Sequence, residues 1–414
     1  MPDAPLQAEL VIFDDGRGAF GPLTQVWPAF AIRSGALRNA TRIAHALQRR
    51  IGGVLVGQTH AALTREAYPG VPVNDVSKMG AVLAVNGRWS ASDDTLTGAI
   101  LGLPSGEALV TAEGDCVAMH ITGPALASLA GNGWNIEHGA SAGATRACEA
   151  ELFTRPWHIL EHLDARLTND IAALGLPLCT GLPHGVTRVG GHAIHLHEAA
   201  TLAPHVHLDT TLGPIALDAQ ANVQPFTVIE GPCYLGPDAV VAPNSTLRAG
   251  CVIGRGCKVG GELKAAILDD FSNKAHYGYL GNAIVGRWCN LGAGTTASNL
   301  KNTWGEVRMQ LDVDTPAEPT GRNFLGPLVG DFARTAIGTM LPTGAVVGAG
   351  ACLVASGFAP KHVPALTFFT DDGPQLTDLA SLRTTLERMM QRRGQAPTEV
   401  LMQRLDALAQ AQRV

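Results

Sequence analysis

The first group of residues that could do chemistry is a glycine-rich loop. Asp14 to Gly21 reads DDGRGAFG and follows a predicted strand, Glu9 to Phe13. Backbone amides of such a turn can cradle nucleotide phosphates, so Gly16 and Gly18 are candidate nucleotide-binding residues. The glycine pattern is weak taken alone, and its meaning depends on the elements around it.

A second group consists of five histidines close together in the sequence: His192, His195, His197, His205 and His207. Alternation along a strand places His195 and His197 on one face. No cysteine or carboxylate spacing completes a closed zinc site, so we predict no metal site there.

Composition limits the classes of protein that remain. The chain has 414 residues, 46% hydrophobic and 16% charged, which predicts two soluble domains. A net charge of −6 gives no basic surface for nucleic acid. No apolar run approaches the ~20 residues that span a bilayer, and MPDAPLQAEL lacks a signal-peptide pattern, so we expect a cytoplasmic protein without membrane contact.

The eight cysteines form no CxxC pair in a chain without secretion signals. We therefore predict reduced thiols rather than disulfides or a metal centre. The repeat described next accounts for several of them as small space-filling residues.

A six-residue repeat dominates the second half of the chain. Every sixth residue is aliphatic over one unbroken run: Leu217, Val223, Ile229, Leu235, Val241, Leu247, Ile253 and Val259. Four places after most of them comes a small residue: Ala221, Thr227, Cys233, Ala239, Ser245, Cys251 and Cys257. The pattern resumes at Val285, Leu291, Leu341, Val347 and Leu353.

Strand alternation cannot give a period of six unless a turn intervenes. One short strand and one corner per hexad make a triangular coil from three hexads, with the aliphatics stacked inside and the small residues at the corners. The repeat therefore predicts a parallel β-helix, with loops thrown out where the pattern is interrupted.

The first half predicts an α/β domain with a mainly parallel sheet. Strands are expected at Glu9–Phe13, 53–56 and 82–85, and helices at 35–50 and 93–101. A connector helix is predicted over 155–171. Apolar residues at helical spacing then predict a tail after Thr370 that packs through Leu376, Leu379, Leu382, Leu386, Val400, Leu401, Leu405 and Leu408. We place the domains at 1–190, 191–370 and 371–414.

Two motifs connect the repeat to a known family. Residues 273–283 read NKAHYGYLGNA, and CNLGAGT at 289–295 is followed by Asn299. The chain from about Gly213 to Ala355 resembles the acetyltransferase domain of the bifunctional N-acetylglucosamine-1-phosphate uridylyltransferase and glucosamine-1-phosphate acetyltransferase. Whole-chain likeness is closer to a branch of sugar nucleotidyltransferases with the same left-handed parallel β-helix, in which segments such as Phe13-Asp14-Asp15, Pro22-Leu23-Thr24, Val259-Gly260-Gly261-Glu262 and Ser272-Asn273-Lys274 recur.

The resemblance implies roles for individual residues. His276 is similar to the general base that deprotonates a sugar amine as it attacks acetyl-CoA, a task that suits imidazole. By the same resemblance, cations for the sugar phosphate are Arg248 and Lys264, and sugar contacts are Tyr279 and Asn290. Asn299 and the backbone of Ala293 match groups near the acetyl carbonyl, and Thr339 stands where the family has a serine beside the thioester. Our own hypothesis is that Glu262 orients or charge-stabilises His276.

Simpler interpretations accompany several of these roles. A lysine on a β-helix face, such as Lys264, is usually just solvated. Asn290 and Asn299 are also typical turn residues. The motif around His276 favours a functional role for that histidine.

The first domain departs from the nucleotidyltransferase pattern. The family's loop arginine falls at Phe20, its lysine after the proline Pro28 falls at Ala29, and its metal-binding aspartate is replaced in Val85-Asn86-Gly87-Arg88. Metal-assisted phosphoryl transfer needs carboxylates for Mg²⁺ and cations for the triphosphate. Arg17, Arg33 and Asp14 are the candidates to substitute, and Mg²⁺ is expected only if this domain is active.

The resemblance thus predicts an acetyltransferase that acts on acetyl-CoA and an amino-sugar 1-phosphate, and it implies a homotrimer. A bifunctional enzyme that also uses UTP or another nucleoside triphosphate is one alternative. Another is a non-catalytic or regulatory sugar-nucleotide binder with a degenerate nucleotidyltransferase domain. A β-helix carbonic anhydrase is disfavoured, because its metal needs three histidines and His276 has no evident partners.

Overall fold

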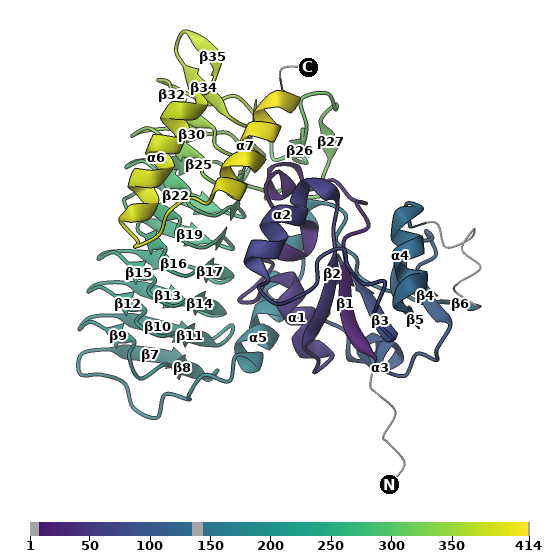
Figure 1. The fold of residues 1–414 in the computed structure, drawn as a ribbon. Helices are drawn as coiled ribbons and strands as arrows, with labels where there is room; N and C mark the ends of the chain where they lie inside the picture. Colours follow the sequence, from purple (N-terminus) through teal and green to yellow (C-terminus); the bar gives the residue numbers. More distant parts are fainter. Residues whose placement is uncertain (1–7, 135–143, 413–414) are drawn as a thin grey trace. The chain divides into compact units, whose positions relative to one another are not determined.

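The computed structural model describes residues 8–134 and 144–412, and the chain forms two compact units (Figure 1). Unit 1 comprises Met1–Ala19, Trp27–Ile32 and Leu37–Arg155. Unit 2 comprises Phe20–Val26, Arg33–Ala36 and Pro156–Val414. The fold class predicted from the sequence is confirmed: an α/β unit is followed by a parallel β-helix with helices at its C-terminal end.

Unit 1 is built on a six-stranded sheet in the order β2-β1-β3-β5-β4-β6. β1 runs parallel to β2 and β3, whereas β5 is antiparallel to β3 and β4, so the sheet is mixed. Its strands are β1 Glu9–Phe13, β2 Ile51–Leu55, β3 Ala81–Asn86, β4 Glu107–Val110, β5 Cys116–Thr122 and β6 Ala144–Ala147.

Helices cover both faces of this sheet. Alternate residues of β1 point to opposite faces and are buried in two different hydrophobic clusters. Leu10 and Ile12 pack with residues of α1 and α3, and Val11 and Phe13 pack with residues of α4. The Asp93 side chain caps α3 by accepting from the amide of Thr95 at 2.8 Å. The helices are α1 Asn39–Ala46, α2 Gln58–Ala67, α3 Asp94–Leu101 and α4 Gly123–Gly131, with the 3₁₀ turn η2 at Ala29–Ala31.

The helix predicted over 35–50 is shorter in the structure. It begins only after Arg38, whose backbone is extended, and it ends before Gln48, whose φ is 51°. Residues 33–36 instead belong to unit 2, where Arg33 forms ion pairs with Asp269 and Asp270. The helical pattern in the sequence could not predict these ion pairs between residues far apart in the chain.

Unit 2 is a β-helix whose short strands stack into three sheets, with strands of successive coils parallel. The first sheet contains β7 Thr187–Gly190, β10 His207–Thr210, β13 Val228–Glu230, β16 Thr246–Leu247, β19 Glu262–Lys264 and β22 Tyr279–Gly281. The second contains β8 Ile194–Leu196, β11 Ile215–Leu217, β14 Cys233–Leu235, β17 Cys251–Ile253, β20 Ile267–Leu268, β23 Ile284–Val285, β28 Leu328–Val329, β31 Val346–Val347 and β33 His362–Val363. The third contains β9 Thr201–Leu202, β12 Asn222–Val223, β15 Val240–Val241, β18 Lys258–Val259, β21 Asn273–Lys274, β24 Asn290–Leu291, β29 Arg334–Thr335, β32 Cys352–Val354, β34 Thr367–Thr370 and β35 Gly373–Leu376.

The interior of the solenoid is the predicted aliphatic stack. All eight aliphatics from Leu217 to Val259 are 0% exposed, and Leu217, Leu235 and Ile253 pair in register from coil to coil. Burying each such side chain contributes about 1.5–3 kcal/mol. Cys233 and Cys251, predicted at corners, are the first residues of β14 and β17, and Cys257 lies just before β18. All three are buried, and burial raises the pKa of each thiol, so they serve as packing residues.

The solenoid begins earlier than the boundary that we predicted at residue 191, because β7 already pairs with β10. Before it, the connector is a 3₁₀ turn, η3 Pro156–Leu160, followed by helix α5, Leu163–Ala173. The single predicted helix is therefore wrong. It is interrupted at His162, whose backbone adopts the left-handed conformation with φ 51°.

One excursion interrupts the later coils. It contains a small hairpin of β26 Arg308–Met309 and β27 Glu318–Pro319, and it lies between β25 Thr296–Ala297 and β28. β25 pairs with β30, Met340–Leu341. The segment Gly21–Thr24, the 3₁₀ turn η1, belongs to the same unit, where the Gln25 side chain accepts a 2.7 Å hydrogen bond from the amide of Ala349.

The tail consists of α6, Leu379–Gln391, and α7, Glu399–Ala411. α6 buries Leu382, Leu386 and Met390, and α7 buries Leu401, Met402, Leu405 and Ala409. Leu376, predicted to be in a helix, lies instead in β35, which forms a hairpin with β34 through a turn at Asp371-Asp372. Within the described residues, no helix is long and apolar enough to cross a membrane.

Candidate functional site

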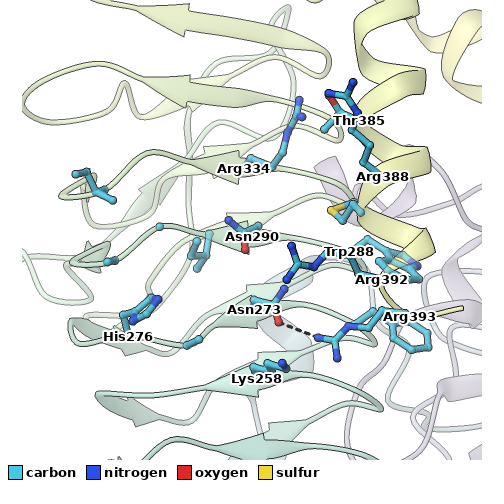
Figure 2. Close-up of a pocket in the computed structure, with 17 residues that line it drawn as sticks. Lys258, Asn273, His276, Trp288, Asn290, Arg334, Thr385, Arg388, Arg392 and Arg393 are labelled. Carbon is cyan, nitrogen blue, oxygen red and sulfur yellow. Dashed lines mark hydrogen bonds between the residues drawn. The ribbon is translucent and has the colours of Figure 1, made fainter. Parts of the chain in front are cut away.

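A pocket of about 820 Å³ lies on the outer face of the third sheet, under helix α6 (Figure 2). The residues that line its floor are stacked on successive coils by the strand register. Lys258 pairs with Asn273, Asn273 with Asn290, and Asn290 with Arg334. Each of these residues precedes a buried, inward-facing residue in its strand, so their side chains point outward. The third sheet therefore presents a polar column along successive coils.

Helix α6 supplies the opposite wall. Leu382, Leu386 and Met390 are buried. The pocket is lined by the adjacent face of the helix and the two residues after it: Thr385, Arg388, Met389, Arg392 and Arg393. The helix thus packs through one stripe and presents a basic stripe to the pocket.

The pocket is strongly basic. Lys258, Arg334, Arg388, Arg392 and Arg393 line it, and among the described lining residues there is no aspartate or glutamate. Arg393 donates to the Asn273 side chain at 3.2 Å, and the Nε of Arg334 is buried without a hydrogen-bond partner in the described part of the chain. Such a cluster of donors suits an anion with several phosphate oxygens.

One end of the pocket is aromatic. The rings of Phe271 and Trp288 stack with centroids 4.4 Å apart and planes inclined by 20°. Both residues hold left-handed corner positions, with φ 63° and 59°, on successive coils. Trp288 is 6% exposed and Phe271 is partly exposed, so the pocket combines the apolar ring surface of Phe271 with cations, the features that a nucleotide needs.

His276 lines the same pocket, in the corner between β21 and β22. Its side chain is exposed, and within the described residues the imidazole makes no hydrogen bond. Its backbone carbonyl accepts a 2.9 Å hydrogen bond from Nζ of Lys274. The ring nitrogens are therefore open to a substrate while the backbone is held.

The structure divides the acetyl-transfer residues predicted from the sequence into two sets. His276, Asn290 and Ala293 line the pocket. Arg248, Glu262, Tyr279 and Asn299 form a second set at the first sheet, where Glu262 and Tyr279 are register neighbours. The sequence motif did not indicate this division.

The second set is internally connected. Arg248 lies 3.5 Å from the Glu262 carboxylate and 4.0 Å from that of Glu230. The Asn299 amide donates to the Tyr279 hydroxyl at 3.0 Å and to the Asn282 side chain at 2.8 Å. Burial raises the pKa of Tyr279, and the charge of Glu262 raises it further. The orienting role of Glu262 toward His276 stays a prediction.

Of the remaining two residues predicted for acetyl transfer, Lys264 belongs to the same strand as Glu262 of the second set, and Thr339 lies near Ala293. Lys264 is exposed at the end of β19. Thr339 is 3% exposed, and its hydroxyl donates to the carbonyl of Ala336 at 2.8 Å. The carbonyl of Ala293 accepts from the amide of Gly338, so Ala293 and Thr339 lie on neighbouring corners.

Arg33, predicted to bind nucleotide, is separated from the glycine-rich loop by the division into units. It belongs to unit 2, where its guanidinium lies 2.9 Å from Asp269 and 2.8 Å from Asp270 with its side chain 10% exposed. Burial alone would lower the pKa of Arg33, but the two aspartates raise it on balance. The arrangement is that of a structural ion pair.

The charged side chains of the glycine-rich loop, Asp14 to Gly21, are already bonded to other groups of unit 1. The Asp14 carboxylate accepts from the backbone amides of Gly16 at 3.0 Å and Ala29 at 2.9 Å. Arg17 lies 2.7 Å from Asp115, and Gly16 and Gly18 have positive φ, as their turns require.

The residues that would hold Mg²⁺ in a nucleotidyltransferase do not fit the ion here. Arg88 binds both oxygens of Asp15 at 2.9 and 2.7 Å and lies 3.1 Å from Asp115. Burial alone would raise the pKa of Asp115, yet hydrogen bonds from Arg17 and Arg88 lower it on balance. Among the residues described, no group of three or more His, Cys, Asp or Glu side chains could hold a metal.

The histidines near residue 200 have individual partners. The Nδ1 of His195 is 2.9 Å from the carbonyl of Leu176, the Nδ1 of His207 is 2.9 Å from the Thr187 hydroxyl, and His205 stacks on Phe226. These contacts belong to the packing of the first coils.

Several pocket residues were missed from the sequence. Lys258, Asn273 and Arg334 each precede an inward position of the repeat, and that alternation could have identified them as outward-facing. For Arg388 in α6, and for Arg392 and Arg393 just after it, the sequence showed only several arginines close together.

The fold and the family match define the class of this protein. Residues 10–176 match the family described as sugar nucleotidyl transferase. This segment is similar to that family, and the resemblance recognised from the sequence is confirmed at modest identity.

Curated relatives are similar to part of the chain. The chain is 29% identical over 189 residues to the bifunctional protein GlmU of Jannaschia sp. (strain CCS1), which is 44% of this chain and 36% of that protein. It is 29% identical over 159 residues to a bifunctional sugar-1-phosphate nucleotidylyltransferase/acetyltransferase of Sulfurisphaera tokodaii, 38% of this chain and 39% of that protein. The matched part spans well under half the length of these relatives. The printed name of the second relative describes a transferase with two activities.

Among solved structures, PerB from Caulobacter crescentus in complex with CoA and GDP-perosamine covers 90% of this chain and 99% of its own, at 12% identity and a TM-score of 0.14. A likeness at this score does not bear on function.

Proposed function

We propose that the protein is an acetyltransferase that moves the acetyl group of acetyl-CoA to the amine of an amino-sugar 1-phosphate similar to glucosamine 1-phosphate. One observation carries the proposal: an exposed histidine with open ring nitrogens, His276, lines a pocket that also contains five cations. CoA has a diphosphate and a 3′-phosphate, so its charge matches these cations, and the partly exposed ring of Phe271, which stacks on the buried Trp288, offers a surface for its base.

The reaction needs one proton acceptor. The sugar nitrogen attacks the thioester carbonyl, the C–N bond forms as the C–S bond breaks, and His276 takes the proton that the nitrogen loses. The CoA thiolate leaves and is protonated from solvent or from the imidazolium. A positioned general base of this kind typically contributes ~10²-fold to 10⁴-fold in rate.

The second set of residues supports a role in holding the sugar phosphate. Arg248 and Lys264 supply cations, and Tyr279 supplies a hydroxyl, on the first sheet and not on the sheet that floors the pocket. We propose a homotrimer, in which a neighbouring copy would bring the second set to the pocket of the first. Light scattering tests this, and a monomer would contradict it.

Nucleotidyl transfer is not part of the proposal. Asp15 and Asp115, the carboxylates beside the loop, are bound by Arg88, and no step that uses Mg²⁺ follows from this arrangement. This observation favours a degenerate nucleotidyltransferase domain in unit 1, as one of the alternatives anticipated.

The proposal is tested by thiol release from acetyl-CoA in the presence of glucosamine 1-phosphate. We expect turnover by the unaltered protein and a loss of ~10²-fold or more in His276→Ala with the fold retained. His192→Ala is the matched control, because His192 is exposed on the solenoid outside the pocket. No thiol release with several amino-sugar phosphates would contradict the proposed function. Near-normal turnover of His276→Ala would contradict the role of the base.

A further inference from the structure

Lys274 occupies an inward position of the solenoid that elsewhere holds aliphatic residues. In the third sheet it continues the column Val223, Val241, Val259, and its side chain is 1% exposed. An ammonium group in such an interior is disfavoured unless its hydrogens are bonded. Burial accordingly lowers the pKa of Lys274 to about 8.

The amino group of Lys274 joins two coils. Nζ donates to the carbonyl of Gly260 on the preceding coil at 3.1 Å and to the carbonyl of His276 on its own coil at 2.9 Å. The amide of Gly260 in turn donates to the carbonyl of Lys274 at 2.7 Å. One side chain therefore ties the corner after β21 to the coil before it.

This corner depends on that bond. Residues 275–278 lie between β21 and β22, with His276 and Tyr277 exposed. Among the hydrogen bonds of the described residues, the His276 carbonyl accepts from Lys274 and from no other donor. A valine at position 274 would continue the column but leave this carbonyl without its donor.

We propose that Lys274 is a positioning residue, whose amino group reaches out of the solenoid interior to hold the backbone of His276 and so keeps the imidazole at the basic pocket. The inference rests on the proposed function, because it assigns to His276 the task of the base. Acceptance of a proton requires the base within hydrogen-bond reach of the amine, so a loosened corner lowers the rate without touching the substrate.

The test is Lys274→Met, since a methionine continues the apolar column at similar length. We expect the variant to be at least as resistant to urea as the unaltered protein. Its kcat for acetyl transfer should fall ~10-fold or more, with the KM for acetyl-CoA unchanged. Hydrogen exchange at the amides of Tyr277 and Gly278 should accelerate.

Leu353→Met is the matched control, because Leu353 is 1% exposed and faces inward on the same sheet away from the corner. It should alter neither kcat nor exchange at 277–278. Lys274→Leu is the second variant if methionine does not fit, with the same expected result.

The outcomes separate this inference from the proposed function. If Lys274→Met turns over normally, or loses activity only in proportion to unfolding, the positioning role is overturned. If no thiol is released even by the unaltered protein, the proposed function fails. The exchange rates then still decide whether Lys274 holds the corner, and unchanged exchange at 277–278 would overturn that as well.

Discussion

Arg88 binds Asp15 through two hydrogen bonds, from Nε at 2.9 Å and from Nη2 at 2.7 Å, with the side chains 0% and 4% exposed. A guanidinium thus neutralises the carboxylate that follows the first strand of unit 1. The same cation also contacts Asp115 at 3.1 Å. Arg88 lies in the segment 85–88, where the sequence departs from the metal-binding aspartate that the resemblance implied.

Removal of Arg88 should therefore both destabilise unit 1 and release its carboxylates. We expect Arg88→Met to lose about 3–5 kcal/mol of unfolding free energy, because a buried carboxylate is left without its partner. Urea denaturation measures this loss. Arg146→Met, which breaks the more exposed pair with Glu107, is the control and should change stability by less than about 1 kcal/mol.

Metal binding provides an independent check on the same pair. Electron paramagnetic resonance of Mn²⁺ should show no tight binding to the unaltered protein, with or without UTP. No pyrophosphate should be released from UTP and a sugar 1-phosphate. Tight Mn²⁺ binding that is lost in Asp15→Asn would show that the ion displaces Arg88 and would restore nucleotidyl transfer as a possibility.

The basic pocket should bind CoA through its phosphates. Arg334→Ala and Arg392→Ala should each weaken CoA binding ~10-fold in calorimetry, and the loss should be smaller for dephospho-CoA. Arg383→Ala is the control, because Arg383 lies on the same helix but pairs with Glu399 outside the pocket. Equal affinities in all three variants would place CoA elsewhere.

Stability should depend on pH through Lys274. Burial lowers its pKa to about 8 in the folded chain from 10.5, so between these values the unfolded chain binds more protons. The unfolding free energy should therefore rise with pH across this window, by at most about 1.4 kcal/mol per pH unit. Urea titrations at about pH 7.5, just below this window, and at about pH 9 and 10, within it, measure the rise. The same slope in Lys274→Met would assign it to another group.

The aliphatic interior should tolerate no cavity. Ile253→Ala, at a position that is 0% exposed, should cost about 2–5 kcal/mol in urea unfolding. Val354→Ala, on the 44% exposed side of β32, is the control and should cost less than about 1 kcal/mol. Similar losses for both variants would show that the stack of branched aliphatics does not dominate stability.

The sequence was sufficient to predict the solenoid because its cause is local. Every sixth residue must face inward, and Leu217 to Val259 do so without exception. The coil from Val259 to Lys274 is shorter than those before it, so the count is interrupted where the interior column receives a lysine. Periodicity could not indicate that Lys274 continues the column.

The candidate site was predictable only in part. The motif around His276 identified the histidine and Asn290, which both line the pocket. The arginines of α6 depend on where a tail helix packs, which no local pattern specifies. Arg33 was a candidate to replace the missing cations of a nucleotide site, but its partners Asp269 and Asp270 lie far along the chain.

The column Lys258, Asn273, Asn290 and Arg334 keeps its register whatever the length of chain between neighbouring members. Asn290 and Arg334 are register neighbours although the β26–β27 hairpin intervenes between them. Because strands of successive coils are hydrogen-bonded to each other, a residue's place in the column depends on its coil. A loop that leaves the solenoid at a corner and returns there does not change that place. Extra sequence inserted at the exposed Asp312–Thr315 tip should therefore spare the pocket, which makes that tip a natural place for new modules to be accommodated.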